Sequence, residues 1–445
     1  MKIKNSTIAQ YNERNLDHHQ EQFAYLNLQL DRLEMNADDI VERLQQFQVA
    51  IPSWALGAGG TRFGRFSMGG EPSNLEEKID DVGLIHRLTQ SAGAISLHIP
   101  WDIPKDVEGI RQRAASYGIV FDAVNSNTFQ DQPKQDYSYK FGSLSNTDPF
   151  SRTQAIEHNL EVIEYGKSLG SKSITVWLAD GSTFPGQHNF RKAFQNTQHS
   201  LQEIYRHLPA DWRMFIEYKP YEPNFYSTVI QDWGSSLMLA EGCGEKAFTL
   251  VDLGHHLPNT NIEQIVAILM MKGKLGGFHF NDSKYGDDDL TCGSIKPYQL
   301  FLIFNELIGD FGFPISNIRT SPTDIQHPTS EIKPSFSEIS FMIDASHNIK
   351  DPLEDLMQSL EAIRIAYAQS LLVDRVALEE AQMEQDVTRC QEILQTAYRT
   401  DVRPLVAEAR RLSGGALDPI DFYRQMDVRK QLIRTRGENV VATGL

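Results

Sequence analysis

Carboxylate and imidazole side chains recur in this sequence at the ends of short apolar, β-branched segments. Four successive segments end in this way, and the polar residues that follow them are Glu217 and Lys219; Asp252, His255 and His256; His279, Asn281, Asp282, Asp287, Asp288 and Asp289; Asp344 and His347. If these segments are neighbouring parallel strands, their carboxyl ends open on one face and the side chains surround one cavity. Carboxylates crowded into a cavity repel one another, and divalent cations held by oxygen and imidazole ligands remove that repulsion.

The spacing predicts two metal sites. The first takes one ligand from each segment, namely Glu217, Asp252, His279 and Asp344. The second shares Glu217 and adds His255, Asp287 and Asp289. Alternate side chains of an extended loop point the same way, so the Asp-x-Asp spacing aims Asp287 and Asp289 at one ion while Asp288 points out.

Each residue taken alone has a simpler interpretation. A histidine in VDLGHH can be a hydrogen-bonded core residue, three aspartates in a loop are usually a solvated turn, and Glu217 with Lys219 can be a plain ion pair. The metal hypothesis is favoured because it needs all four segment ends to carry ligand-type residues at once, and they do. Mn²⁺, Mg²⁺, Co²⁺ and Zn²⁺ all suit such ligands.

The three segments further upstream end in aromatic and polar side chains. These are His98, Trp101 and Asp102 in SLHIPWD; Asn125, Asn127 and Phe129 in NSNTFQD; Trp177 and Asp180 in TVWLADGS. Aromatic rings stack on the apolar faces of a polyol while carboxylates and metals bind its hydroxyls, so the mixture indicates a sugar pocket, with core packing as the alternative for each ring. The Gly-rich stretch LGAGGTRFGRF is not followed by G-K-[ST], and a nucleotide site is not expected.

Eight apolar segments alternate with amphipathic ones, which predicts a (β/α)₈ TIM barrel rather than an open sheet. The predicted strands are 48–54, 94–99, 119–125, 172–178, 214–218, 247–253, 277–281 and 340–344. Residues 1–47 are expected to form an N-terminal helical segment broken near Asn36. Residues 48–370 are expected to form the barrel, with a surface insertion at 310–338 that acts as an oligomer contact or a lid. Residues 371–445 are expected to form a C-terminal helical arm.

Composition narrows the class of protein. The 445 residues include 59 acidic and 42 basic ones, giving a net charge of −17, which disfavours nucleic acid and anionic membranes as partners. The three cysteines are far apart in sequence, which fits a reducing compartment and excludes a disulfide framework. The amino-terminal residues lack the apolar core of a signal peptide, and a cytoplasmic location is expected.

Eight long motifs spread over nearly the whole chain carry a family resemblance. They are PSWALGAGGTRFGRF, SLHIPWD, NSNTFQD, TVWLADGSTFPGQ, VDLGHHLPNTNIE, GFHFNDSKYGDDDL, MIDASHN and AYRTDV. Together they resemble the L-rhamnose isomerase family, in its bacterial branch of broad sugar specificity. The resemblance implies a barrel akin to xylose isomerase, a homotetramer, and two divalent metal ions that assist interconversion of an aldose and a ketose, with Mn²⁺ expected first among the ions above.

The same resemblance implies roles for individual residues. Glu217, Asp252, His279 and Asp344 would hold a structural ion, and Glu217, His255, Asp287 and Asp289 a catalytic one. His98, Trp101, Trp177 and Lys219 would contact the sugar, and Phe63 would reach the site of a neighbouring subunit. The insertion at 310–338 is longer than the family pattern.

The expected reaction is conversion of L-rhamnose to L-rhamnulose, with D-allose and L-mannose as further substrates, by a metal-assisted 1,2-hydride shift. Asp287 and Asp289 would hold the catalytic metal and its water, Lys219 would help polarise a substrate oxygen, and Trp101 with Trp177 would exclude water. Asp344 completes the predicted catalytic set. The alternatives are a ketose 3-epimerase or another xylose isomerase-like enzyme, a nuclease, which the negative charge disfavours, and a binding protein that has kept the barrel.

Overall fold

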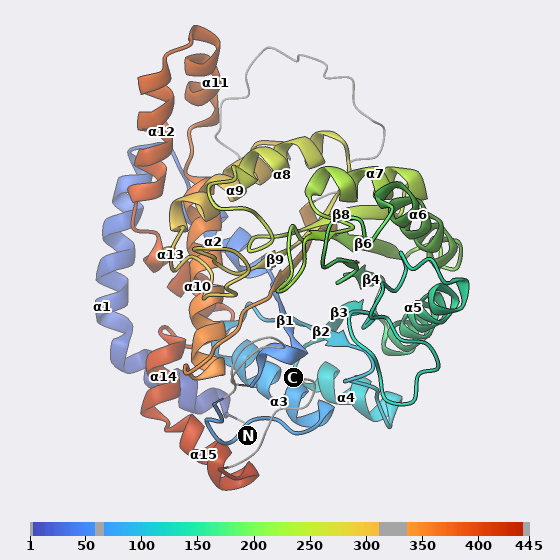
Figure 1. The fold of residues 1–445 in the computed structure, drawn as a ribbon. Helices are drawn as coiled ribbons and strands as arrows, with labels where there is room; N and C mark the ends of the chain where they lie inside the picture. Colours follow the sequence, from blue (N-terminus) through green and yellow to red (C-terminus); the bar gives the residue numbers. More distant parts are fainter. Residues whose placement is uncertain (1–2, 58–65, 311–335, 439–445) are drawn as a thin grey trace.

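Eight parallel strands close into a barrel in this computed structural model, which describes residues 3–57, 66–310 and 336–438. Around the barrel the strands follow the order β1, β10, β9, β8, β6, β4, β3 and β2 (Figure 1). Their bounds are β1 Ala50–Pro52, β2 Ala94–His98, β3 Val120–Asn125, β4 Ser173–Val176, β6 Arg213–Glu217, β8 Ala247–Asp252, β9 Leu275–Phe280 and β10 Ser340–Ile343. Each lies within or next to a predicted apolar segment, so the predicted TIM barrel is confirmed.

Helices cover the outside of the barrel between successive strands. They are α3 Leu75–Thr89, α4 Val107–Ser116, α5 Pro149–Leu169, α6 Phe190–Arg206, α7 Trp233–Cys243, α8 Ile262–Met271, α9 Pro297–Asp310 and α10 Pro352–Leu371. Six of them begin after an Asn or Asp whose side chain accepts a hydrogen bond from a backbone N–H of the first turn. Such caps satisfy N–H groups that a helix leaves unpaired at its start, which fixes where each helix leaves its loop.

Strand register brings the predicted ligands together. Asp252 on β8 pairs with His279 on β9, and His279 in turn pairs with Met342 on β10. β9 and β10 also lie close, because a Cβ on Gly277 would stand 2.6 Å from the carbonyl oxygen of Ser340. A larger residue at Gly277 would push these two strands apart, so the glycine keeps His279 near the end of β10.

The N-terminal and C-terminal helices lie together along one side of the barrel (Figure 1). They are α1 Asn5–Asp31, α2 Ala37–Gln46, α11 Arg375–Glu384, α12 Val387–Arg399, α13 Arg403–Leu412, α14 Pro419–Gln425 and α15 Val428–Arg436. The predicted break near Asn36 is confirmed, since its side chain caps α2. α13 packs against α1, α2 and α10, so both ends of the chain attach to the same flank. α14 and α15 lie within the predicted C-terminal helical arm, 371–445, whereas the domain boundaries themselves remain a prediction.

Shorter elements complete the described chain. β5 (Gly181–Ser182) and β7 (Ser227–Thr228) form a small antiparallel sheet that the sequence did not predict, and η1 (Ser53–Ala55) and η2 (Phe336–Glu338) are 3₁₀ turns. Most of the predicted insertion, 311–335, and Phe63 lie outside the described residues. Within those residues, no helix has the length and apolar character needed to cross a membrane.

Candidate metal centre and sugar pocket

Four side chains converge at the carboxyl-terminal mouth of the barrel. One possible ligand atom from each of Glu217, Asp252, His279 and Asp344 lies within 4.8 Å of the corresponding atoms of the other three. The Nδ1 atom of His279 is 3.2 Å from Glu217 Oε1, 3.7 Å from Asp252 Oδ2 and 3.6 Å from Asp344 Oδ2. These are the four residues of the first predicted site, each from or just after a different strand.

Two of these carboxylates are held from behind. Asp252 Oδ1 accepts hydrogen bonds from Asn281 Nδ2 at 2.9 Å and from the Gly254 amide at 2.7 Å. Asp344 Oδ1 accepts one from the indole Nε1 of Trp54 at 2.9 Å. In both residues the other oxygen, Oδ2, faces His279. The supporting groups therefore turn one oxygen of each carboxylate toward the centre of the cluster.

The cluster fits a divalent cation. Asp252 Oδ2 and His279 Nδ1 are buried, yet neither makes a hydrogen bond of good geometry, although His279 Nδ1 lies 3.2 Å from Glu217 Oε1. Buried polar atoms are normally bonded, and a missing partner marks a place for an ion or water. Three carboxylates and one imidazole form a hard, oxygen-rich ligand set that suits Mn²⁺, Mg²⁺, Co²⁺ or Zn²⁺.

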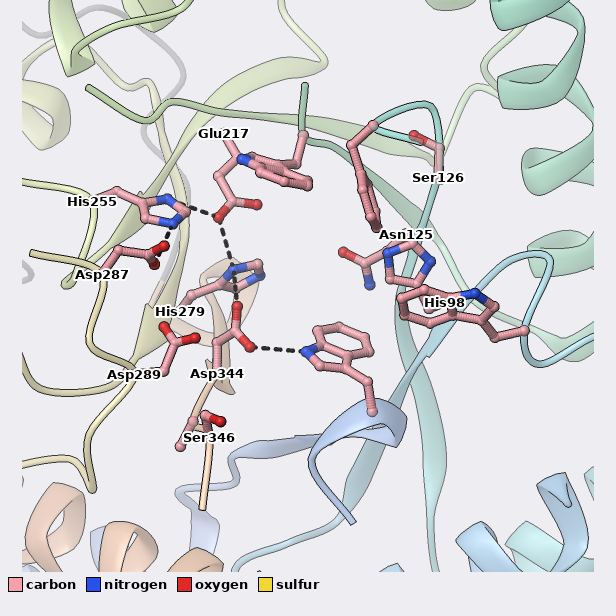
Figure 2. Close-up of a pocket in the computed structure, with 15 residues that line it drawn as sticks. His98, Asn125, Ser126, Glu217, His255, His279, Asp287, Asp289, Asp344 and Ser346 are labelled. Atoms are coloured by element: carbon pink, nitrogen blue, oxygen red, sulfur yellow. Dashed lines mark hydrogen bonds and ion pairs between the residues drawn. The ribbon is translucent and has the colours of Figure 1, made fainter. Parts of the chain in front are cut away.

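The second predicted set lies next to the first. Glu217 Oε1 is 3.2 Å from His255 Nδ1 as well as from His279 Nδ1, which places Glu217 between the two sets as predicted. His255 Nε2 is 3.1 Å from Asp287 Oδ1. Asp287 and Asp289 both line the pocket, on the same side as His255 and His279 (Figure 2). Within the described chain, the second set does not form a four-residue cluster as tight as the first. The other oxygen of Asp287, Oδ2, is engaged by Lys219 Nζ at 2.6 Å.

The loop that carries these aspartates differs from the predicted extended form. Asp287 and Asp289 have φ angles of 51° and 48°, in the left-handed region, so alternation along an extended chain is not what aims them. Instead, the Asp287 amide donates to Gly254 O and the Asp289 carbonyl accepts from the Ser346 amide. The carboxylate of Asp288 accepts from the Lys284 and Tyr285 amides, so it folds back onto the loop. Unlike Asp287 and Asp289, Asp288 does not line the pocket, in agreement with its predicted direction.

Crowding changes the protonation of the cluster in the metal-free protein. Burial would lower the pKa of His279, but Glu217, Asp252 and Asp344 raise it to about 10. His255 also has a raised pKa, because Asp252 and Asp287 outweigh its burial. Burial would raise the pKa of Glu217, but the two imidazoles hold it below its usual range. For Asp344, burial raises the pKa to about 6 against the opposing effect of His279.

An aromatic wall faces this acidic side of the pocket. Figure 2 places His98, Asn125 and Ser126 across the cavity from Asp287 and Asp289. The centroid of the His98 ring lies 4.3 Å from that of Trp101 and 5.6 Å from that of Phe129. The ring centroids of Phe129 and Trp177 are 4.7 Å apart. Burial lowers the pKa of His98 to about 3, so its imidazole is neutral near pH 7. All four predicted aromatic or imidazole residues therefore line the pocket.

Other polar residues at the strand ends do not face the pocket. Asp180 accepts from the amides of Ser143 and Ser145, and Asp282 accepts from those of Ile295 and Lys296, so both hold loops. His256 bonds Tyr218, and His347 lies between Asp355 and Ala55 O.

Lys219 and Trp54 depart most from the sequence-based expectation. Lys219 Nζ lies 2.6 Å from Asp287 Oδ2 and 2.5 Å from Glu222 Oε1, buried behind the pocket lining. Trp54 lines the pocket, although sequence reasoning did not select it. The same rule of strand ends, applied to PSWALG after the first predicted strand, would have found it.

The chain is similar to two curated proteins over nearly their whole length. It is 50% identical over 419 residues to a probable sugar isomerase of Mesorhizobium japonicum, covering 93% of this chain and 92% of that protein. It is 48% identical over 434 residues to a probable sugar isomerase of Rhizobium meliloti, covering 98% of this chain and 96% of that protein. The chain belongs to this family of sugar isomerases. Membership of a sugar isomerase family is thereby confirmed, whereas the reaction and L-rhamnose as the substrate stay predictions.

More distant similarities agree with the family's fold. A xylose isomerase of Thermus thermophilus is 25% identical over 242 residues, covering 49% of this chain and 60% of that protein. The solved structure of an L-ribulose 3-epimerase has a TM-score of 0.50 at 12% identity, covering 76% of this chain and 98% of the other. The structure of the IOLI protein with a bound zinc atom has a TM-score of 0.50 at 11% identity, covering 73% of this chain and 99% of the other. Identities this low show the barrel fold alone. No protein-family model matches the chain.

Removing the support of Asp252 should weaken metal binding. In Asn281→Leu the Asp252 carboxylate loses a hydrogen bond that orients it, and the dissociation constant for Mn²⁺ should rise by about 10–100-fold. Titration of metal-stripped protein with Mn²⁺, followed by electron paramagnetic resonance, measures this. The matched control is Asn196→Leu on α6, where the lost bonds go to Ser145 O and Asn146 O and metal affinity should not change. Equal Mn²⁺ affinity in both variants would contradict the supporting role of Asn281.

Metal affinity should increase as pH rises. The raised pKa of His279, about 10, means that this imidazole holds a proton near pH 7, and Asp344, with a pKa of about 6, holds one at lower pH. A metal ion must displace these protons, so the Mn²⁺ dissociation constant should fall by about tenfold per pH unit for each proton displaced. Calorimetry in buffers of different ionisation enthalpy counts the released protons. A dissociation constant that stays flat between about pH 6 and about pH 8 would show that the cluster binds no protons.

Proposed function

We propose that this protein is a metal-dependent aldose–ketose isomerase that converts L-rhamnose to L-rhamnulose and also accepts other aldoses, including D-allose and L-mannose. The observation that carries the proposal is the cluster of Glu217, Asp252, His279 and Asp344 facing an aromatic wall in one pocket. Membership of the sugar isomerase family supports it, and the motif resemblance to L-rhamnose isomerases supports the choice of sugar.

The proposal assigns two divalent ions to each subunit, with Mn²⁺ first and Co²⁺, Zn²⁺ or Mg²⁺ as alternatives. Glu217, Asp252, His279 and Asp344 would hold one, and Glu217, His255, Asp287 and Asp289 would hold the other. When bound, such ions supply the positive charge that polarises the carbonyl and neighbouring hydroxyl oxygens of an open-chain sugar.

The residues of the chain position and shield the sugar. Trp101, Phe129 and Trp177 present ring faces and edges that stack on its C–H surfaces and exclude water from the carbons that exchange hydrogen. The neutral imidazole of His98 has a buried Nδ1 without a hydrogen-bond partner, which suits a sugar hydroxyl. These roles match the reaction, because hydrogen transfer between adjacent carbons requires polarised substrate oxygens and the exclusion of water from the reacting carbons.

Lys219 acts in this proposal through its neighbour. Its ammonium group is held between Asp287 and Glu222 and lies 5.3 Å from the Trp177 ring. It therefore orients the Asp287 carboxylate, and the predicted direct contact with a sugar oxygen would require this arrangement to open.

The proposal also includes a homotetramer in which Phe63 reaches a neighbouring subunit. Large apolar side chains are exposed on and just after α1, with Tyr25 66%, Leu28 59% and Leu33 58% accessible. Surfaces of this kind are often covered in an assembly.

A substrate panel with reloaded metal tests the function. Metal-stripped protein reloaded with Mn²⁺ should convert L-rhamnose and other aldoses to their 2-ketoses, identified by NMR. Glu217→Gln should keep the fold but lower kcat/KM at least about a hundredfold. Glu217 is proposed as a ligand of both ions, and loss of a residue that only orients a metal ligand already lowers activity by about 10–100-fold. Glu408→Gln is the matched control, since Glu408 pairs with His19 and Arg411 away from the pocket. With fructose or tagatose as the substrate, products epimerised at C3 with no aldose formed would instead establish the 3-epimerase alternative.

The route of hydrogen transfer is tested in deuterated water. A 1,2-hydride shift moves hydrogen directly between C1 and C2, so product formed in D₂O should carry no substantial deuterium at either carbon. Substantial incorporation at C1 or C2 would replace this route with proton transfer through an enediol. Mass spectrometry of product taken early in the reaction measures the incorporation before back-reaction occurs.

A further inference from the structure

A buried ion pair lies beneath the aromatic wall and takes no part in the proposed reaction. Lys78 Nζ on α3 is 2.7 Å from Asp102 Oδ1 in the loop after β2, and each side chain is 1% exposed. Removing two charges from water costs free energy that their attraction does not always restore. A pair in this position therefore calls for an explanation other than stability.

The Asp102 carboxylate ties two strand ends together. Its Oδ2 accepts a hydrogen bond from the His98 amide at 2.9 Å and another from the hydroxyl of Ser53. The Asp102 amide donates back to His98 O at 2.9 Å. His98 is the last residue of β2, and Ser53 opens η1 directly after β1. One buried carboxylate thus fixes the ends of two neighbouring strands where they enter the pocket.

Both strand ends lead directly to the site. Trp54 follows Ser53, and its indole N–H donates to Asp344 Oδ1, the ligand-type residue that follows β10. The Trp54 ring also packs edge-on against His98, with 5.5 Å between ring centroids. A continuous series of contacts therefore runs from Lys78 through Asp102, Ser53 and Trp54 to Asp344 in the cluster of candidate metal ligands.

We propose that the Lys78–Asp102 pair positions Trp54 and His98, and through the Trp54 hydrogen bond sets the orientation of Asp344 for metal binding. Lys78 and Asp102 are positioning residues, since neither lines the pocket. The inference concerns metal binding by the four clustered side chains. It rests on the proposed function only where it extends to sugar turnover.

The chain offers a matched pair for comparison. Asp81 lies on the same helix as Lys78, is 2% exposed, and pairs with Arg436 on α15 at 2.7 Å. Its contacts tie the C-terminal helix to α3 and do not reach the pocket. Asp102→Asn and Asp81→Asn thus each remove one negative charge from a buried ion pair that includes a residue of α3, and only the first pair is connected to the site.

The test combines Mn²⁺ affinity, thermal unfolding and near-ultraviolet circular dichroism of metal-stripped protein. Both variants should lower Tm. Asp102→Asn should raise the Mn²⁺ dissociation constant by about tenfold or more and should lose the same circular dichroism band that Trp54→Phe removes. Asp81→Asn should keep both the affinity and the band. The proposal is overturned if Asp102→Asn binds Mn²⁺ like the wild type, or if Asp81→Asn weakens binding equally.

A second variant keeps the test open if Asp102→Asn does not fold. Lys78→Met/Asp102→Asn leaves no unpaired charge and should recover Tm without recovering Mn²⁺ affinity, and Trp54→Phe should reproduce that affinity loss. Wild-type affinity in either variant would overturn the proposal. None of these readouts needs a sugar, so a wild-type protein that binds Mn²⁺ but isomerises no aldose would refute the proposed function and leave this inference standing.

Discussion

Repulsion among carboxylates at one end of the barrel is the constraint on which the site depends. Glu217, Asp252 and Asp344 come from strands that a closed parallel barrel makes open on one face, and the following loop adds Asp287 and Asp289. In the metal-free protein the imidazoles compensate in part, which is why the pKa of His279 is raised to about 10. A divalent cation supplies that compensation in place of protons, and this couples metal binding to pH.

Charges packed this closely keep their arrangement only if each carboxylate is anchored on the side away from the ion. Asn281 anchors Asp252, Trp54 anchors Asp344, and Lys219 anchors Asp287. Each anchor leaves an oxygen of its carboxylate facing the cluster. In our proposal the Lys78–Asp102 pair anchors the anchors themselves: Asp102 bonds the ends of the strands that lead to Trp54 and His98.

The pocket is divided into two chemically different sides. The carboxylates, with the imidazoles of His255 and His279, occupy the side formed by β6, β8, β9 and β10, whereas the aromatic wall of His98, Trp101, Phe129 and Trp177 lies at the ends of β2, β3 and β4. A polyol has both hydroxyls and apolar C–H faces, and it can satisfy both sides at once. The division therefore agrees with the sugar isomerase family to which the chain belongs, and it follows from which strands end in acids and which in aromatic residues.

The sequence by itself determined the barrel and the identity of the cluster residues. Strand and helix periodicity is local, and parallel strands always open their carboxyl ends on one face, so Glu217, Asp252, His279 and Asp344 could be predicted to meet. Only the tertiary structure decided the rest. The Trp54–Asp344 hydrogen bond joins residues 290 positions apart, and the left-handed backbone at Asp287 and Asp289 is held by contacts with other loops. Such features depend on which distant loops meet at the mouth of the closed barrel, and no local pattern in the chain encodes those meetings.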